Sequence, residues 1–532
     1  MLKVKLHPRE IYQRSTEFGL KNSANMLTQI IEKEKDDIKR RDAIKYLGMI
    51  SNNSIQLKNE CYKTFENLLI SDDKIEIKCE AAKALGRLNI EKSLKPLNWI
   101  LEQKPVDYNV KLSALKAIYK TRFEETEIRL FINELDNSIN SIREYVSIQL
   151  LSLNLEKLIP LLLGALKNRK LSNNHKAEII KLIGYEISSV NVSFEDVSFL
   201  KAKYPEILTE IIQNKDTILE VVTQILKEED LSLLDSVVSI LKLMENEVRK
   251  DLLKLLLLDD FIVKKNAVVL CGKLKLNDAI DLLISNLDNI YKEVTIAAIE
   301  ALGEIGDLSA VPELLDILDI EDVSFEYTDL DMKLYILDSI KRIYQNNQSS
   351  SYEYLYNALK KENDTVRESV AFLLGEIAKE EFVKPLCDLL VIRNLDVKKN
   401  TIIALGKIGS VAPLRDLQKI IENENTYWLI KKVTIDAIYN IFQNNWYKTK
   451  DSKQEISRIL NKYLAILTDF LKAKESENHK VKLSLIKLLE NFGGELALSA
   501  LINRVNDFHR VVRIHASNAI KRIEERLELE NS

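Results

Sequence analysis

The sequence predicts an all-α protein, a right-handed α–α superhelix of about 14 helix-pair repeats. Three observations favour this fold class. Gly and Pro together account for 13 + 8 = 21 of the 532 residues, fewer than the many tight turns of a sheet-rich fold require. A segment of about 33 residues recurs along the chain, and the apolar residues within each copy follow helical spacing.

Each repeat is anchored on one position, which is glycine in seven of the fourteen units. The segments 294–305 and 397–408 both place apolar residues in the same order and reach Ala-Leu-Gly near their ends. The fourteen anchor positions are Gly48, Gly86, Tyr119, Leu151, Gly184, Leu241, Gly272, Gly303, Lys341, Gly375, Gly406, Tyr439, Glu490 and Lys521. An anchor glycine removes a side chain where two helices approach closely. Each unit is therefore expected to be two antiparallel helices whose apolar stripes are buried by stacking on neighbouring units.

Glycine and proline also mark the expected ends of helices. Gly306, Gly409 and Gly493 lie three residues beyond an anchor, where a left-handed residue that ends a helix is expected. Five prolines follow an anchor by seven to ten residues and are expected to open the next helix, because a first-turn N–H has no partner within a helix. They are Pro96, Pro160, Pro312, Pro385 and Pro413.

The repeat resembles the HEAT repeat, and specifically the HEAT-like repeat named after phycobilisome (PBS) lyases. In that repeat, helix B begins with Val-Arg or Val-Lys and ends with Ala-Leu-Gly. The resemblance covers nearly the whole chain and is strong from about Phe261 to Ile441 and weaker between Gly184 and Leu241. It implies a HEAT or armadillo-like solenoid in which the B helices line the concave face.

The repeat spacing predicts three regions. Residues 1–187 form an N-terminal half, and residues 261–532 form a C-terminal half with a longer unit near 442–472 and a charged terminal cap. Between them, residues 188–260 hold irregular, degenerate repeats. We hypothesise a hinge there, because residues 188–196 supply few large apolar side chains for stacking.

Composition limits the class of protein. The chain is 46% apolar and 30% charged, and its net charge is 77 − 81 = −4, so it is not strongly basic. Its apolar runs are too short to cross a bilayer, and its first residues lack a secretory signal, so no membrane insertion is expected. The four scattered cysteines form no CxxC pair, which favours a reduced, cytoplasmic protein.

The sequence contains no recognisable catalytic or cofactor motif. None of the five histidines is followed by Glu, so HExxH is absent. The His-Glu pairs that hold di-iron in the HEAT-repeat deoxyhypusine hydroxylases are absent too. No phosphate-binding loop, dinucleotide fingerprint or GxSxG turn is present. The sequence therefore predicts a protein that is not an enzyme, with no catalytic residue, no cofactor and no metal.

One basic pattern stands out eight residues before the anchors. We call it the basic ladder: Arg40, Lys78, Lys111, Arg143, Lys176, Lys264, Lys333, Arg367, Lys398, Lys431, Lys482 and Arg513. Either each cation pairs with a nearby carboxylate and sets the register between units, or the ladder forms a concave groove for an anionic partner. The carboxylates available for pairing are Asp37, Asp73, Asp107, Asp260, Asp364, Asp396 and Asp507.

An acidic and aromatic patch interrupts the C-terminal half. Its residues are Asp316, Asp319, Glu321, Asp322, Glu326, Tyr327, Asp329 and Asp331. Further tyrosines follow at short spacing up to Tyr356, and one or two of them should be exposed. The patch is either a solvated loop or a contact surface for a basic partner segment.

These features favour a non-enzymatic scaffold or adaptor that binds a partner protein along the concave face or rim. Nucleic-acid binding through the basic ladder is an alternative that the net charge of −4 disfavours. A bilin-lyase-like modifying subunit is a second alternative, which rests on the name of the repeat. The sequence identifies neither the partner nor the oligomeric state.

Overall fold

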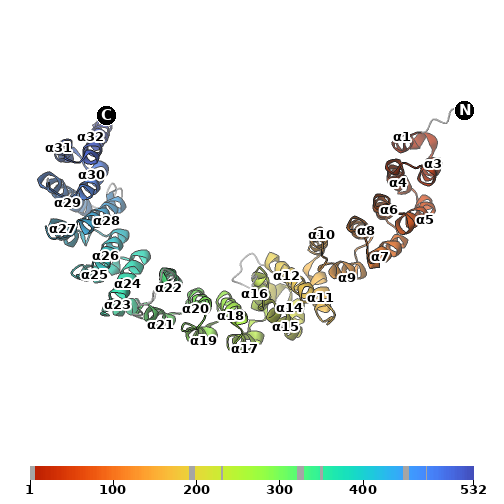
Figure 1. Cartoon of the computed structure of the whole chain (residues 1–532), viewed down its shortest axis with the longest axis horizontal. Coiled ribbons are helices and arrows are strands. Elements are labelled where there is room, and N and C mark those ends of the chain that lie inside the picture. The colour runs from red at the N-terminus through yellow and green to blue at the C-terminus, as the bar shows by residue number, and fades with distance from the viewer. Residues whose placement is uncertain are drawn as a thin grey trace. The chain divides into compact units, whose positions relative to one another are not determined.

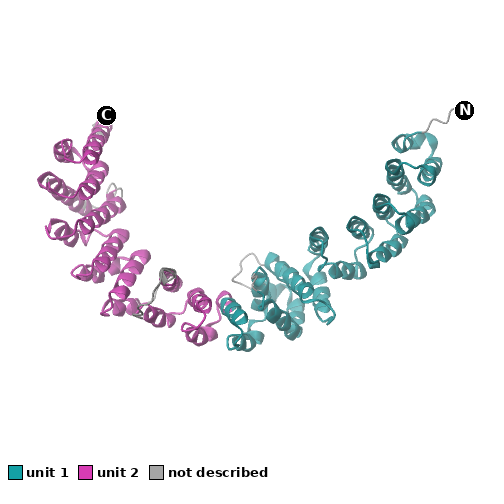
Figure 2. Ribbon diagram, viewed as in Figure 1, with its two compact units in different colours: residues 1–270 teal, residues 271–532 magenta. Residues whose placement is uncertain are grey.

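The structure is a computed structural model, and the residues that it describes are 6–190, 198–228, 232–319, 329–347, 351–446, 454–474 and 476–531. Within these ranges the regular structure is helical and includes no β-strand, so the predicted all-α class is confirmed. The chain divides into two compact units, residues 1–270 and 271–532 (Figure 2). The boundary falls within helix α18 (Phe261–Leu274), and the hinge near 188–260 stays a prediction.

Unit 1 consists of two helix layers with short additional helices. The A layer holds α3 (Leu20–Lys33), α5 (Ile55–Ser71), α7 (Leu94–Glu102), α9 (Glu125–Asn133), α11 (Leu155–Leu166), α14 (Pro205–Gln213), α15 (Lys215–Ile225) and α17 (Glu245–Leu255). The B layer holds α4 (Asp37–Ser51), α6 (Ile75–Leu88), α8 (Tyr108–Thr121), α10 (Asn140–Leu150), α12 (Asn173–Val190), α16 (Leu234–Leu243) and the start of α18. The short helices are α1 (Pro8–Gln13), α2 (Ser15–Phe18), α13 (Ser198–Lys203) and the 3₁₀ turn Glu91–Ser93.

Unit 2 has the same two layers. Its A layer holds α19 (Ile280–Ser285), α21 (Ala310–Ile317), α23 (Glu353–Leu359), α25 (Val383–Leu389), α27 (Leu414–Glu422), α29 (Gln454–Ala473) and α31 (Glu495–Arg504). Its B layer holds α20 (Lys292–Ile305), α22 (Asp329–Asn346), α24 (Asp364–Ile377), α26 (Leu395–Ile408), α28 (Trp428–Trp446), α30 (His479–Phe492) and α32 (Arg510–Asn531). The 3₁₀ turns Asn277–Ala279 and Glu380–Phe382 precede α19 and α25. Within each unit, the B helices follow the inner side of that unit's own curve (Figure 1).

The anchor glycines allow neighbouring B helices to touch. A Cβ atom added to Gly86 on α6 would lie 2.8 Å from the Cα of Ala117 on α8, closer than real Cβ atoms approach. The same clash, at 2.7 Å, would arise between Gly375 on α24 and Ala404 on α26. The structure therefore agrees with the expected role of the anchor glycine, which is to leave no side chain at a helix–helix contact.

The expected helix ends are correct at two of the three glycines. Gly306 (φ 81°) and Gly409 (φ 74°) take the left-handed conformation after α20 and α26, whereas Gly493 has φ −74° and does not. The carbonyl oxygen of each left-handed glycine accepts a hydrogen bond from an asparagine at the C-terminal end of the next B helix. The Asn347 side-chain amide donates to Gly306 O at 2.6 Å, and Asn445 donates to Gly409 O at the same distance. These bonds tie successive repeats together.

Four of the five prolines lie at the start of a helix. Pro96, Pro312 and Pro385 are the third residues of α7, α21 and α25, and Pro413 is the N-cap of α27. First-turn N–H groups have no partner within the helix, so proline costs little there. The expectation is wrong for Pro160, which lies in the interior of α11.

The irregular region of unit 1 keeps the B layer continuous. α12 packs directly on α16, and a Cβ atom on Gly184 would lie 2.4 Å from the Cα of Ser236. In the A layer, two helices replace one, since α14 contacts α11 and α15 contacts α17. The residues expected to flex include 191–197, which lie outside the described part of the chain. Among the described helices, none is both long and apolar enough to cross a membrane.

Candidate functional site

The basic ladder occupies one structural position. Its members are the fourth residue of a B-layer helix, except Lys333, which is the fifth residue of α22. A cation in the first turn is disfavoured by the positive end of the helix dipole, by about 0.3–1 kcal/mol. The ladder side chains therefore benefit from acidic or carbonyl partners.

Several ladder cations reach a carboxylate in the next repeat, just before the following B helix. Arg40 contacts Asp72 at 2.5 Å, Lys111 contacts Glu134 at 2.7 Å, and Lys431 contacts Glu477 at 2.9 Å. The side chain of Lys431 is only 7% exposed. These cations connect neighbouring repeats and are not open to a partner.

The ladder is most deeply buried near the C-terminal end. Lys482 lies 2.8 Å from Asp507, and the two side chains are 4% and 1% exposed. The guanidinium of Arg504 approaches the same carboxylate at 3.5 Å. Burial acts to raise the pKa of Asp507, but hydrogen bonds from Lys482, the His509 N–H and Arg504 outweigh it and hold the pKa below its usual value.

Other ladder members bond differently. Arg367 contacts Asp364 within α24 at 2.9 Å, Arg40 also contacts Asp37 at 3.1 Å, and Lys333 contacts Glu368 at 3.4 Å. Four members donate to backbone carbonyl oxygens at 2.6–3.4 Å: Arg40 to Ile31, Lys78 to Ile70, Arg143 to Asn137, and Arg513 to Asp507 and Phe508. Lys176, Lys264 and Lys398 have no side-chain hydrogen bond or ion pair within the described ranges.

The expected acidic partners are correct only in part. Asp37, Asp364 and Asp507 pair with ladder cations, although Asp507 pairs with Lys482 of the preceding repeat. Asp107 and Asp260 instead accept hydrogen bonds from backbone N–H groups at the starts of α8 and α18. The contacts therefore support a structural use of the ladder, and its use as a binding site stays a prediction.

A second set of lysines, which the sequence interpretation missed, lies five residues after ladder members. We call it the lysine row: Lys45, Lys83, Lys116 and Lys181, on α4, α6, α8 and α12 of unit 1. Lys83, Lys116 and Lys181 are exposed, and Lys45 is half-buried. The constant offset from Arg40, Lys78, Lys111 and Lys176 was the signal in the sequence that could have identified the row.

Aromatic rings support two members of this row. The ammonium of Lys45 lies 5.5 Å from the ring centroid of Tyr46, and that of Lys116 lies 5.5 Å from the ring of Tyr145 on α10. Neither ammonium has a carboxylate within 4 Å among the described residues. Lys83 and Lys181 contact Glu80 and Glu178 at 3.5 and 3.4 Å. The two lysine side chains are themselves about half exposed, and ion pairs of such surface lysines are weak.

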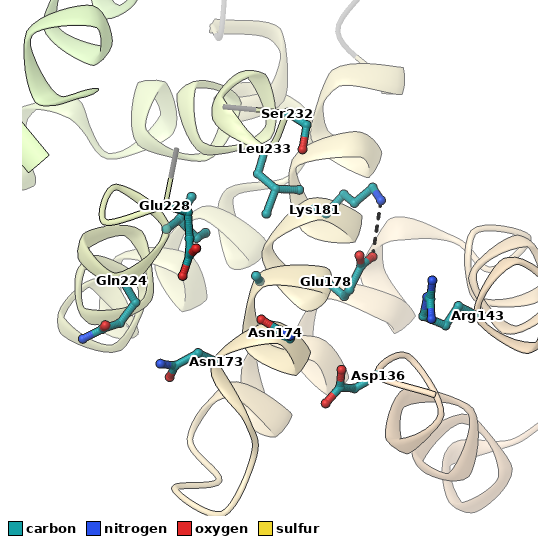
Figure 3. Close-up of a pocket in the computed structure, with 12 residues that line it drawn as sticks. Asp136, Arg143, Asn173, Asn174, Glu178, Lys181, Gln224, Glu228, Ser232 and Leu233 are labelled. Carbon is teal, nitrogen blue, oxygen red and sulfur yellow. Dashed lines mark hydrogen bonds and ion pairs between the residues drawn. The ribbon is translucent and has the colours of Figure 1, made fainter. Parts of the chain in front are cut away.

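One pocket of unit 1 adjoins the end of this row (Figure 3). It has a volume of about 430 Å³ and lies between α10, α12, α15 and the start of α16. Figure 3 shows Lys181 joined to Glu178 on α12, with Arg143 on the neighbouring helix. Asp136 accepts a hydrogen bond from Ser172 at 2.5 Å. Both cations that line the pocket, Arg143 and Lys181, already have partners, so the pocket offers little free positive charge to an anionic ligand.

A basic groove lies in the B layer of unit 2. It has a volume of about 560 Å³ and is lined by α28, α30 and α32. Four cations line it, namely Lys432, Lys480, Lys487 and Arg522, together with Asp436 and Glu490. We call it the α30 groove.

The acidic and aromatic patch is described only in part. Asp316 and Asp319 both contact Lys361, at 2.7 and 3.0 Å, and so connect two A-layer elements. Glu321, Asp322, Glu326 and Tyr327 lie outside the described residues, as do the side chains of Asp329 and Asp331. The role of the patch in partner binding stays a prediction.

The neighbouring tyrosines divide between core and surface. Tyr344 and Tyr352 stack in the core with ring centroids 4.8 Å apart, and Phe382 packs on Tyr352. Tyr335 and Tyr354 are exposed. Two exposed tyrosines agree with the expected number.

The histidines have structural surroundings. His175 is buried, and its Nε2 lies 2.7 Å from the carbonyl oxygen of Ile132. His479 and His509 place their ring centroids 4.6 Å apart. Among the described residues, no three His, Cys, Asp or Glu side chains come together as a metal site.

Two family models match segments of unit 2. Residues 352–438 match the model of HEAT repeats, and residues 296–319 match the PBS lyase HEAT-like repeat. No curated protein matches the sequence significantly.

Solved structures with similar folds are distant. A structure of Kap95p with RanGDP is 11% identical, with 98% of this chain and 80% of that chain covered and a TM-score of 0.41. Importin beta is 11% identical, with 97% and 77% covered and a TM-score of 0.45. A Kap121p mutant is 12% identical, with 97% and 63% covered and a TM-score of 0.46. These low values carry no information on partner or activity. Both units stack helix pairs as an α-solenoid does, and the segments 296–319 and 352–438 of unit 2 are similar to HEAT repeats.

Proposed function

We propose that this chain is a non-enzymatic scaffold that binds an acidic segment of a partner protein along the B layer of unit 1. The lysine row carries the proposal. Whereas many ladder cations are used between repeats, Lys45 and Lys116 present ammonium groups that no described carboxylate neutralises. Nearby aromatic rings hold these cations in place, which lowers the entropy cost of engaging an anion.

The spacing of the row favours an extended partner. Neighbouring packed helices lie about 8–10 Å apart, so α4, α6 and α8 present one lysine at about that interval. A polyproline II segment rises about 9.3 Å per turn of three residues. An acidic residue at every third position of such a segment would meet one lysine in each repeat.

The alternatives have less support. Asp42, Glu80 and Glu178 share the B-layer surface with the lysine row, so this surface is not the continuous basic face that nucleic acid favours. No described feature of the molecule favours a bilin-lyase-like activity.

The test is affinity purification from the native host with mass spectrometry. The triple variant Lys45→Gln, Lys83→Gln and Lys116→Gln removes three row charges but keeps the aliphatic stems. The control is Lys58→Gln, Lys63→Gln and Lys95→Gln, which removes three charges from α5 and α7 of the A layer.

We expect the wild type and the control to recover the same partner, and the triple variant to recover about tenfold less, since three exposed pairs contribute about 0.5 kcal/mol each. Equal recovery by the triple variant would contradict the proposal. So would a bound fraction that nuclease releases, because that result would indicate nucleic acid.

A further inference from the structure

The α30 groove contains two cations that contact no carboxylate among the described residues. Lys432 contacts Asp436 at 2.6 Å, and Arg522 pairs with Glu490, so the two walls of the groove are close to neutral. Lys480 and Lys487 on α30 are exposed, and neither has a carboxylate within 4 Å in the described parts of the chain. The positive charge is therefore concentrated on the middle helix.

Both unpaired lysines rest on aromatic rings of the neighbouring helix. The Lys480 ammonium lies 4.9 Å from the ring centroid of Trp428, and that of Lys487 lies 4.7 Å from the ring of Tyr439. These contacts direct both side chains toward α28 and limit their motion. The arrangement repeats that of Lys116 over Tyr145 in unit 1.

We propose that the α30 groove binds an acidic α-helix of a partner protein, with carboxylates seven residues apart on one face. This inference rests on the proposed scaffold function and specifies the partner segment for unit 2. Lys480 and Lys487 are themselves seven residues apart on a helix, so they lie on one face and are separated by about 10.5 Å along its axis. Acidic side chains at i and i+7 of a partner helix have the same spacing. Same-face residues of a β-strand recur at about 6.7 Å and 13 Å, which fits less well.

The width of the groove also suits a helix. α30 packs directly on both α28 and α32. At about 8–10 Å per packed pair, the axes of α28 and α32 lie about 16–20 Å apart. A helix with its side chains is about 10–12 Å across, so it can rest over α30 between the two flanking helices. Lys432 and Arg522 would then flank it and could exchange their intramolecular partners for acidic residues of the guest.

Fluorescence anisotropy with the full-length protein tests the inference. The probe is a labelled Ala-rich helical peptide with Glu at every seventh position. Its isomer has the same composition with Glu at every fifth position, which scatters the charges around the helix. A third version carries the heptad Glu residues but is interrupted by Pro and cannot form a helix.

Two double variants accompany these peptides. Lys480→Gln with Lys487→Gln removes the unpaired charges, and Lys462→Gln with Lys472→Gln removes two exposed charges from α29 of the same unit. Circular dichroism is used to check that both variants fold. We expect the heptad peptide to bind the wild type and the control alike, to weaken with added salt, and to bind the Lys480/Lys487 variant about tenfold less tightly.

The proposal is overturned if the heptad peptide does not bind, if its isomer or the Pro-interrupted version binds as tightly, or if the Lys480/Lys487 variant keeps full affinity. Displacement of the peptide by single-stranded RNA at lower concentration would overturn it in favour of nucleic acid. Failure of this proposal would not decide the proposed function, because the lysine-row variant that tests that function changes residues of unit 1 alone.

Discussion

Substituting Gly86 by Ala tests the helix contact on which the solenoid depends. A methyl group at this position would lie 2.8 Å from both the Cα and the Cβ of Ala117 on the next B helix. The Cα belongs to the backbone, so relief requires α6 and α8 to separate. Overpacking of this kind costs about 1–3 kcal/mol. The same substitution gains about 1 kcal/mol of helix propensity, which hides part of that cost.

Gly164 provides the matched control. It lies within α11 of the same unit, and an added Cβ there has no atom within 4 Å. Gly164→Ala should therefore gain the propensity term alone and stabilise the protein by about 1 kcal/mol. The difference between the two variants isolates the contact and should be about 1–3 kcal/mol.

The measurement is urea unfolding of both variants, followed by hydrogen exchange in α6 and α8. We expect Gly86→Ala to unfold at a lower urea concentration than Gly164→Ala and to exchange faster in these two helices. Adding Ala117→Gly to Gly86→Ala should recover only part of the loss, because the new methyl group still meets the backbone of α8. Equal stability of the two single variants would refute the close-contact explanation of the anchor glycines.

Three further predictions concern buried groups. Asp507→Asn should destabilise the protein by about 3–5 kcal/mol because it removes the buried carboxylate that pairs with the buried Lys482. Asp416→Asn at an exposed pair should cost at most about 1 kcal/mol. Equal unfolding midpoints of the two variants would contradict this prediction. The pKa of Asp507 is lower in the folded protein than its unfolded value of about 3.9. Asp507 therefore contributes to folding stability above about pH 3.9, and this contribution is lost as the pH falls through the folded pKa. In Asp507→Asn, this acid-dependent part of the stability–pH curve should disappear. Burial raises the pKa of Cys271 to about 12 and that of Cys387 to about 11. At pH 8, a maleimide should therefore label the half-buried Cys387 slowly and the buried Cys271 only after denaturant is added. Rapid labelling of Cys271 in the native protein would contradict this prediction and show that its helix opens.

The sequence was sufficient to predict the helix pairs because the repeat encodes short-range geometry. Gly86 and Gly375 could be recognised from their positions in the repeat, and at both of them an added Cβ atom would meet the backbone of the next B helix. Gly493 shows the limit of this reasoning. It occupies the same place in the repeat as Gly409 but has φ −74°, and the next repeat begins directly at α31. The conformation at the end of a helix therefore also depends on how soon the next helix begins.

The partners of charged residues were harder to predict because a one-residue shift changes the direction of a side chain. Asp73 was expected to pair with a ladder cation, yet it is the adjacent Asp72 that pairs with Arg40, a ladder cation of the preceding repeat. The lysine row escaped notice for a different reason. A lysine on an exposed helix surface is ordinary, and although its five-residue offset from the ladder marks Lys116, only the structure places Tyr145 beside its ammonium group.

The ladder contacts give the solenoid a direction. Arg40, Lys111, Lys431 and Lys482 each reach a carboxylate that lies later in the chain, 23–46 residues downstream. A ribosome releases the cation of each such pair before its acid, so the ion pair that joins one repeat to the next cannot form until the next repeat has been made. The growing end of the nascent protein therefore stays open to its own continuation.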